Sequence, residues 1–258
     1  MKTNNYILTI AGLDPSSGAG ITSDIKTFEA HQLYGLSVCT AVTVQNDIDF
    51  KECVWIDKTV IISQIETLFE RFKISVVKIG IIQSWEVLSL VLERLHTLNP
   101  EIKIIVDPII KASAGFDFHS LEHQDILDKI WSQCYVITPN YDEIQLLYPD
   151  LSIEETIEHI RSLTNIHLKG GHRKDKTGWD VIYHSKTVVK HIAPKAEKVL
   201  QKHGSGCVLS AALASNILLQ QGIEEASINA KYYTEAFLNS TDSLLGQHSY
   251  PSLKIKSQ

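Results

Sequence analysis

Residues 6–44 read YILTIAGLDPSSGAGITSDIKTFEAHQLYGLSVCTAVTV, and this stretch decides the fold. It begins with a short apolar run, Tyr6 to Ala11, which is typical of a strand. Ile21 to Leu33 then has apolar residues at helical spacing, and Leu36 to Val44 is rich in small and β-branched residues. A strand, a glycine-rich turn, a helix and a second strand in this order predict the beginning of an α/β domain.

The alternation of strands and helices continues along the chain. Further helical patterns cover Thr59 to Phe72, Gly206 to Leu219 and Glu224 to Leu245. Short runs that are apolar on both faces, as buried parallel strands are, occur at Val76 to Ile79, Ile102 to Val106, Tyr135 to Thr138 and Ile166 to Leu168. A hairpin is predicted by Val181 to Tyr183 and Val188 to Ile192. We therefore expect residues 1–258 to form one domain, a doubly wound α/β sandwich.

Composition and charge narrow the functional classes. The 258 residues are 44% hydrophobic and 21% charged, which is typical of a globular domain, and their net charge of −6 leaves no general basic surface for nucleic acid. The longest apolar runs are far shorter than the roughly 20 residues that span a bilayer. Residues 1–6 lack the apolar segment of a signal peptide, so we expect a cytoplasmic protein without a membrane partner. Its four cysteines form no CxxC pair and should be reduced thiols.

Polar residues or glycines follow nearly every predicted strand. In a doubly wound sheet, ligands bind outside the carboxyl ends of the strands, so these residues should face a common site. They are Gly12-Leu13-Asp14, Gln45-Asn46-Asp47, Gly80, Asp107-Pro108, Pro139-Asn140 and Lys169-Gly170-Gly171. Carboxylates, amides, a lysine and glycines at one edge favour a pair of polar, phosphorylated ligands over packing alone.

Two glycine-containing turns precede predicted helices. The turn Asp14 to Gly20 could present backbone N–H groups to an anion, or it could be a plain turn, and it lacks the Lys-Ser/Thr ending of a Walker A loop. Gly204-Ser205-Gly206-Cys207 opens a strongly apolar helix, whose first amides are unpaired donors, and this predicts an anion hole. A thiol in that first turn should have a lowered pKa and could act as a base or nucleophile. The alternative is a cysteine that only packs in the core.

Asn140 and Glu143 lie one helical turn apart after a strand. An amide and a carboxylate at this spacing can hold Mg²⁺ through waters. The same spacing is also that of a helix N-cap with its capping-box glutamate, which needs no metal. From this segment alone the cap is favoured.

Six segments, taken in order, carry a resemblance to a known family. They are AGLDPSSGAGITSDIKTFEAHQLYGLSVCTAVTVQND at 11–47, VVKIGI at 76–81, VDPII at 106–110, ITPNYDE at 137–143, LKGGH at 168–172 and HGSGC at 203–207. Together they resemble the ribokinase-like superfamily, and within it the hydroxymethylpyrimidine/phosphomethylpyrimidine kinases of thiamine biosynthesis. Cys207 discriminates best, because most of the superfamily carries Asp there. The resemblance implies a three-layer α/β/α sandwich with a mostly parallel central sheet, and a homodimer.

The resemblance also implies a reaction, the ATP-dependent phosphorylation of 4-amino-5-hydroxymethyl-2-methylpyrimidine to its monophosphate and then to the diphosphate. Its implied roles fall into three groups. At the substrate it places Gln45, which would read the aminopyrimidine edge, with Asp24, Gly12 and Ile81. At the transferring phosphoryl group it places Cys207, Gly204, Gly206 and Lys169. At ATP and Mg²⁺ it places Lys169, Asn140, Ser205 and Gly206, with Asp107 and Glu143 around the metal.

Two alternatives remain open. The first is a pyridoxine or pyridoxal kinase of the same superfamily, since pyridoxine also presents a hydroxymethyl group beside a ring nitrogen. Gln45 and Cys207 argue against it. The second is a non-catalytic pyrimidine-binding sensor, which intact Cys207, Lys169, Asp107 and Glu143 disfavour. Ile79, Ile81 and Lys202 depart from the usual family residues, and Ile81 bears on substrate selectivity because it lines the expected pocket.

Overall fold

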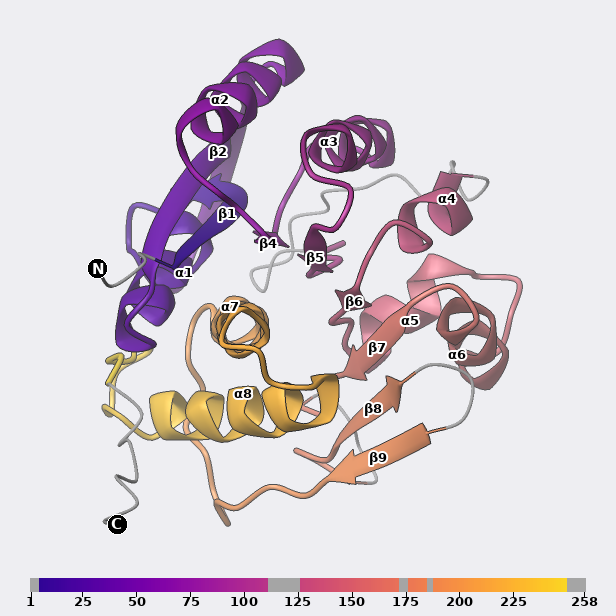
Figure 1. The fold of residues 1–258 in the computed structure, drawn as a ribbon. Coiled ribbons are helices and arrows are strands. Elements are labelled where there is room, and N and C mark those ends of the chain that lie inside the picture. The colour runs from indigo at the N-terminus through magenta and orange to yellow at the C-terminus, as the bar shows by residue number, and fades with distance from the viewer. Residues whose placement is uncertain (1–4, 111–125, 172–175, 185–187, 250–258) are drawn as a thin grey trace, which may run out of the picture.

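A single sheet runs through the molecule in the computed structural model, which describes residues 5–110, 126–171, 176–184 and 188–249 (Figure 1). The described residues form nine strands in the order β3-β2-β1-β4-β5-β6-β7-β8-β9. Their bounds are β1 Tyr6–Leu13, β2 Tyr34–Gln45, β3 Phe50–Trp55, β4 Val76–Ile79, β5 Lys103–Val106, β6 Val136–Ile137, β7 Asn165–Leu168, β8 Asp180–His184 and β9 Val188–Ile192. The six strands β2, β1, β4, β5, β6 and β7 are parallel, and the pairings β2–β3, β7–β8 and β8–β9 are antiparallel. The predicted doubly wound, mostly parallel sheet is confirmed.

Helices cover both faces of this sheet. Their bounds are α1 Gly20–Ala30, α2 Lys58–Arg71, α3 Trp85–Leu98, α4 Leu127–Trp131, α5 Tyr141–Leu147, α6 Ile153–Arg161, α7 Ser205–Leu218 and α8 Ile223–Leu238. Helices α1, α7 and α8 lie on one face and α2 to α6 on the other (Figure 1). None of the described helices is long and apolar enough to cross a bilayer.

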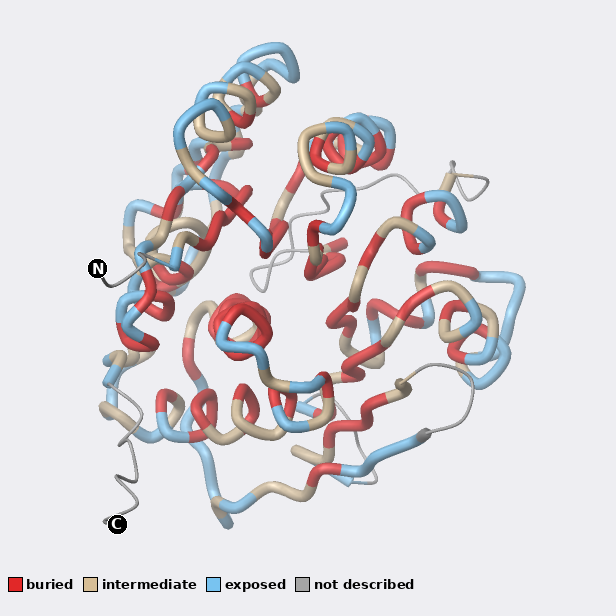
Figure 2. Tube along the Cα trace, in the orientation of Figure 1, coloured by how far each residue is buried: buried red, intermediate tan, exposed pale blue. Residues whose placement is uncertain are grey.

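Each face of the sheet builds its own core because successive residues of a strand point to opposite sides. In β1, Ile7 packs toward α1 and α7, whereas its neighbour Leu8 packs toward α2 and α3. In β4, Val76 and Val77 divide in the same way. Helix α7 is buried from Cys207 to Leu218, which Figure 2 shows as an almost unbroken red coil. Its apolar sequence is therefore explained by burial between the sheet and α8.

One strand and the end of one helix differ clearly from the sequence-based expectation. Strand β3 was not predicted, because the half-exposed residues Phe50 to Trp55 carry Lys51 and Glu52 and lack a continuous apolar run. Helix α8 ends at Leu238 rather than at Leu245. The following residues turn back over the helix, with Gly246 packed against the Phe237 ring. The hairpin of β8 and β9 is confirmed.

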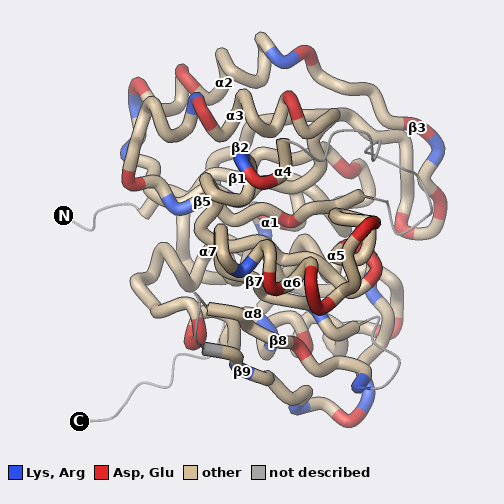
Figure 3. The backbone as a smooth tube through the Cα atoms, turned by 90° about the vertical axis from the view of Figure 1, so that its right-hand side faces the viewer, with Lys and Arg blue, Asp and Glu red and all other residues tan. Residues whose placement is uncertain are grey.

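The charged residues are mixed rather than gathered. Figure 3 shows Lys and Arg scattered among Asp and Glu over the outer helices and around β3. Inside the molecule the described charges are different, because several of them are buried and paired. The pairs nearest the carboxyl ends of the central strands build the candidate site.

Candidate active site

The candidate site lies where the sheet changes direction. Strand β1 pairs with β2 on one side and with β4 on the other, so the connections from these strands leave toward opposite faces. Helix α7 packs across β1, β4 and β5, and its N-terminus points to the carboxyl ends of these strands. A switch point of this kind is where doubly wound sheets bind ligands.

One end of the site is a cluster of charged side chains. The Nζ of Lys169, which follows β7, lies 2.8 Å from Asp107 Oδ1 after β5 and 3.6 Å from Glu143 Oε2 in α5. Thr138 Oγ1 donates to the same Asp107 oxygen at 3.0 Å, and Ser210 Oγ of α7 lies 3.3 Å from the other oxygen. These residues lie in or directly after five different elements, so the parallel sheet brings together groups far apart in the sequence.

Burial and pairing shift the pKa values of this cluster. For Asp107, burial alone would raise the carboxyl pKa, but the positive charges of Lys169 and Lys78 outweigh it and hold the pKa below its usual value. For Glu143, burial and the neighbouring Asp107 charge raise the pKa, although Lys169 acts against them. Burial alone would lower the pKa of Lys169, but the two carboxylates raise it above the ordinary value, so the lysine is a fixed cation. A fixed cation beside a carboxylate is suited to phosphate binding.

The helix cap predicted for Asn140 and Glu143 is present. Asn140 Oδ1 accepts from the Glu143 amide at 2.8 Å, and Glu143 Oε2 accepts from the Asn140 amide at 2.8 Å. Glu143 Oε2 also faces Lys169, so the cap and the charged cluster share one side chain. The two interpretations of this segment are compatible.

The residues present fit Mg²⁺ in the way kinases hold it. Among the described residues, no three His, Cys, Asp or Glu side chains converge as a metal cluster. Mg²⁺ in kinase sites is bound by one or two carboxylates and completed by phosphate oxygens and waters. Asp107 and Glu143, which share Lys169, are the two carboxylates that could hold Mg²⁺ in this way.

The first turn of α7 adjoins this cluster. Helical hydrogen bonding begins with the Val208 amide, which donates to Gly204 O at 3.0 Å, so the amides of Ser205, Gly206 and Cys207 have no acceptor in the helix. A Cβ on Gly206 would lie 3.4 Å from Lys169 Nζ and 3.7 Å from Asp107 Oδ2. The unpaired amides therefore lie beside the charged cluster, as the predicted anion hole requires.

Cys207 lies at the other side of this turn, and its predicted pKa is wrong. Burial raises the pKa of the Cys207 thiol to about 11. Lys78 and a hydrogen bond from the Gly20 N–H oppose this effect without reversing it. The helix N-terminus was expected to stabilise the thiolate, but only 8% of the residue is exposed and desolvation is the larger effect. Cys207 is a thiol at neutral pH.

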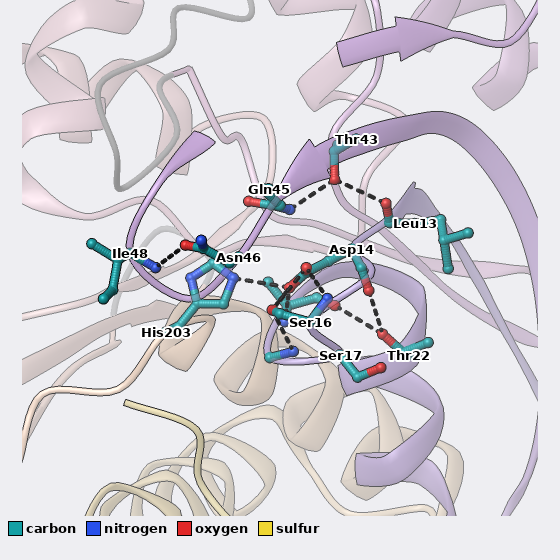
Figure 4. A network of polar contacts seen from close by, with 12 residues as sticks. Leu13, Asp14, Ser16, Ser17, Thr22, Thr43, Gln45, Asn46, Ile48 and His203 are labelled. Carbon is teal, nitrogen blue, oxygen red and sulfur yellow. Dashed lines mark hydrogen bonds and ion pairs between the residues drawn. The ribbon is translucent and has the colours of Figure 1, made fainter. Parts of the chain in front are cut away.

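Three of the predicted substrate residues lie at the ends of β1, β2 and β4. Ile81 packs directly on Gly12, where an added Cβ would lie 2.4 Å from Ile81 Cδ1. Gln45 is half-buried, and its Nε2 donates to Thr43 Oγ1 at 2.9 Å. Thr43 in turn donates to Leu13 O at 3.0 Å, so Gln45 is tied to the end of β1 (Figure 4).

Asp24 does not join these residues, contrary to the prediction that it lies at the substrate. It is fully buried in α1, where both carboxylate oxygens contact Lys78 Nζ, at 2.8 and 3.0 Å, and Thr9 Oγ1 donates to it at 2.6 Å. Because this carboxylate has no exposed surface and bonds to Lys78 and Thr9, it stabilises the packing around the site and does not face the substrate.

Sequence reasoning missed Lys78 and the contact between His203 and Asp14. Lys78 stands in the apolar run Val76 to Ile79, and a charge in a buried strand requires a buried partner, which was the available signal. His203 and Asp14 form the other contact, with His203 Nε2 2.9 Å from Asp14 Oδ2 (Figure 4). Asp14 was expected among the residues that follow the strands but without a role of its own, and His203 appeared only within the motif HGSGC.

Comparisons with known proteins show the family to which this chain belongs. A family model described as phosphomethylpyrimidine kinase matches residues 14–252. The hydroxymethylpyrimidine/phosphomethylpyrimidine kinase of Aquifex aeolicus is 34% identical over 242 residues, which make up 90% of this chain and 94% of that protein. The crystal structure of a phosphomethylpyrimidine kinase from Clostridium difficile superposes with a TM-score of 0.73 at 32% identity, covering 89% of this chain and 97% of that one.

A more distant structure shares the fold. The pyridoxal kinase of Bacillus subtilis, solved as an ADP complex, has a TM-score of 0.80 at 24% identity and covers 98% of this chain and 100% of its own. This likeness extends the shared ribokinase-like α/β fold beyond close relatives. The chain itself belongs to the phosphomethylpyrimidine kinase family.

Proposed function

We propose that this protein uses Mg-ATP to phosphorylate 4-amino-5-hydroxymethyl-2-methylpyrimidine and then phosphorylates the monophosphate to the diphosphate. Family membership supports the reaction class. The observation that carries the proposal is the N-terminus of α7, which has the Asp107–Lys169 pair on one side and Cys207 on the other. Phosphoryl transfer depends mainly on positioning and charge neutralisation, and this arrangement supplies both.

ATP binds at the charged cluster of Asp107, Glu143 and Lys169 in this proposal. Lys169, Asn140, Ser205 and Gly206 bind the ATP phosphates, the lysine by its charge and the start of α7 by its unpaired amides. Asp107 and Glu143 hold Mg²⁺, which when bound neutralises charge on the phosphate oxygens. Gly206 leaves room for the transferring phosphoryl group beside Lys169, while Gly204 lets the segment before α7 pack directly against Gly18 and so shapes the start of the helix.

The pyrimidine, which accepts the phosphoryl group, binds between Gln45 and Cys207 in this proposal. The Gln45 amide can donate and accept at once, which matches the ring nitrogen and the neighbouring amino group of an aminopyrimidine. Gly12 and Ile81 form an apolar wall beside it. Cys207 orients the hydroxymethyl oxygen as a protonated thiol, because a pKa of about 11 leaves little thiolate at neutral pH. The substrate proton leaves late in a loose transfer and passes to an oxygen of the transferred phosphoryl group, directly or through water, as the bond to the ADP leaving group breaks, so an orienting thiol suffices.

Substrate choice separates this proposal from a pyridoxine kinase. The purified protein is incubated with Mg-ATP and the two alcohols, singly and in competition, and the mono- and diphosphates are separated by anion exchange. We expect the pyrimidine diphosphate to accumulate and kcat/KM for pyridoxine to be lower. A kcat/KM for pyridoxine that equals or exceeds the pyrimidine value rejects the assignment. A protein that binds the pyrimidine and makes no product is the non-catalytic sensor.

The variant Gln45→Leu sharpens that test. It should lower kcat/KM for the pyrimidine by roughly 5- to 150-fold, because each unpaired buried polar group costs about 1–3 kcal/mol. Gln145 is exposed on α5, and Gln145→Leu is the matched control. Equal kinetics for both variants would show that Gln45 does not read the ring.

We further propose that residues 1–258 act as one domain, as a homodimer and in the cytoplasm, as the family resemblance suggests. Sedimentation equilibrium of the purified protein tests the oligomeric state. A molar mass near twice 28.9 kDa is expected, and a single-chain mass overturns the homodimer.

A further inference from the structure

Two segments 189 residues apart are joined by a side-chain pair next to the candidate site. His203, which directly precedes Gly204 and α7, places its Nε2 2.9 Å from Asp14 Oδ2. Asp14 is 2% exposed, and the His203 side chain is 14% exposed. Figure 4 shows the imidazole reaching across to the turn that follows β1.

Asp14 organises the whole turn from residue 14 to residue 20. Its Oδ1 accepts from the Ser16 amide and hydroxyl, both at 2.8 Å, and its Oδ2 accepts from the Ala19 amide at 2.8 Å. These bonds and the one to His203 hold the pKa of Asp14 below its usual value although burial acts to raise it. The carboxylate thus ties the turn internally and to the segment before α7.

The backbone of the turn 14–20 packs tightly against the backbone just before α7. Gly204 has φ +73°, and a Cβ there would lie 2.0 Å from Gly18 O. Gly18 in turn faces the His203 ring, since its own added Cβ would lie 2.5 Å from Cδ2 of that ring. The backbone at Gly18 and the backbone at Gly204 are therefore in direct contact, and the His203 imidazole fills the space beside them.

The junction controls a group in the proposed reaction. Gly204, whose backbone packs against Gly18, is the N-cap of α7 and lies three residues before Cys207 in the first turn of that helix. A displacement of the turn relative to α7 would separate Gly18 from Gly204 and loosen the packing at the first turn of the helix, which holds Cys207. Residues 244 and 245 add further contacts here. The His203 amide donates to Leu244 O at 2.9 Å, and the Leu245 side chain packs over Gly18.

We infer that Asp14 and His203 are a positioning pair that fixes the turn 14–20 against the N-terminus of α7 and so sets the place of the Cys207 thiol. The inference rests on the proposed role of this helix start in the reaction. His203 touches neither ligand in this scheme. It acts through Asp14 and Gly18 on the start of α7, which holds Cys207.

Kinetics of four variants give the first test. His203→Ala and Asp14→Asn should each lower kcat for the pyrimidine by about 10- to 100-fold, as misplacement of reacting groups does, with KM changed by less than about threefold. His203→Gln should recover most of kcat, because its side-chain N–H can still donate to Asp14. His191→Ala, on the exposed face of β9, is the matched control and should behave as wild type. A His203→Gln variant no better than His203→Ala overturns the inference.

Thiol labelling without substrate gives the second test and does not depend on the reaction. Each protein is treated with iodoacetamide, and the rates of alkylation of Cys207 and of buried Cys134 are followed by mass spectrometry of their peptides. We expect Cys207 to react at least severalfold faster in His203→Ala and Asp14→Asn, with Cys134 unchanged. Parallel acceleration of both cysteines means general loosening and overturns the inference, as does an unchanged Cys207 rate. A protein that makes no pyrimidine phosphate but shows selective Cys207 labelling rejects the proposed function and keeps the positioning pair.

Discussion

Two Asp–Lys pairs lie beside the start of α7, and they differ in access rather than in geometry. Asp24 and Lys78 are 2.8 Å apart and both side chains are 0% exposed. Asp107 and Lys169 are also 2.8 Å apart, but the Lys169 side chain is 13% exposed and shares a second carboxylate, Glu143. We name these the sealed pair and the open pair.

The difference shows how one kind of interaction serves two purposes. In the sealed pair every charged group is occupied by the partner or by Thr9, so a ligand has nothing to contact. In the open pair the lysine reaches the site next to Gly206, and its two carboxylates carry more negative charge than it neutralises. We therefore expect the sealed pair to govern stability and the open pair to govern activity.

The largest effect should come from Lys169→Ala. Removal of this cation should lower kcat/KM for ATP by about 10²- to 10³-fold, the usual cost of losing one preorganised electrostatic contact at a transferring group. Steady-state kinetics at saturating pyrimidine measure it. Lys190→Ala on β9, where the lysine is exposed, is the control. Wild-type kinetics in Lys169→Ala would place the open pair in the same structural class as the sealed one.

Asp24→Leu should instead act on stability. It leaves the Lys78 charge buried without its partner, which costs about 3–5 kcal/mol of unfolding free energy in comparable cases. Adding Lys78→Met should recover most of this loss, because an apolar pair of similar volume replaces the ions. Urea unfolding followed by circular dichroism measures both. The comparison breaks if the double variant is well folded but loses as much kcat/KM as Lys169→Ala.

Glu143→Gln separates the metal from the helix cap. Glutamine keeps the capping box, since its side-chain oxygen still accepts from the Asn140 amide, but it loses the charge. The Mg²⁺ concentration for half activity should rise roughly tenfold, which corresponds to about 1.4 kcal/mol. Glu155 occupies the equivalent capping position of α6 and is exposed, so Glu155→Gln is the matched control. An unchanged Mg²⁺ response would leave Glu143 as a capping residue only.

The smallest effect is a pH dependence away from both pairs. Burial, with the charges of Lys26 and His31, lowers the pKa of His248 to about 4, whereas an unfolded chain titrates near 6.5. The unfolded state then binds more protons below pH 6.5, so stability is complete above that pH and is lost as the pH falls toward 4. Because His248 is only partly buried, we expect about 1–2 kcal/mol.

Thermal melts from pH 7 to pH 4 test this, with His248→Asn expected to flatten the slope. His191→Asn on β9 is the control. If the slope persists in His248→Asn and disappears in the Asp24→Leu/Lys78→Met variant, the sealed pair titrates in this range. That result would contradict the expectation that the sealed pair contributes to stability without titrating between pH 7 and pH 4.

The two pairs also mark what the sequence could predict. Asp107 and Lys169 follow predicted strands, and the rule that strand ends meet at one edge was enough to bring them together. Asp24 and Lys78 are 54 residues apart, on a helix and inside a strand, and no local pattern indicates that they face each other. The pKa of Cys207 was wrong for a related reason, because the helix N-terminus is visible in the sequence whereas the degree of burial is not.

The elements follow the same division. The parallel strands are mostly apolar and were located to within a few residues, since burial on both faces leaves a strong signal. Strand β3 is held by its pairing with β2 rather than by an apolar core, so its sequence resembles a loop. The end of α8 depends on contacts from elsewhere, among them the Lys202 ammonium, which donates to Thr241 O at 2.6 Å.

The contact of the turn 14–20 with residues 203, 204 and 245 has a consequence for synthesis on the ribosome. The glycine-rich turn is among the first parts of the chain to emerge, whereas its partners are translated more than 180 residues later. Until then Asp14 has no imidazole to bind and Gly18 has no facing backbone. A nascent chain can assemble β1, α1 and β2 early, because domains fold as their segments become available. Competence for the reaction, however, arises only when translation has passed the residues that close this junction.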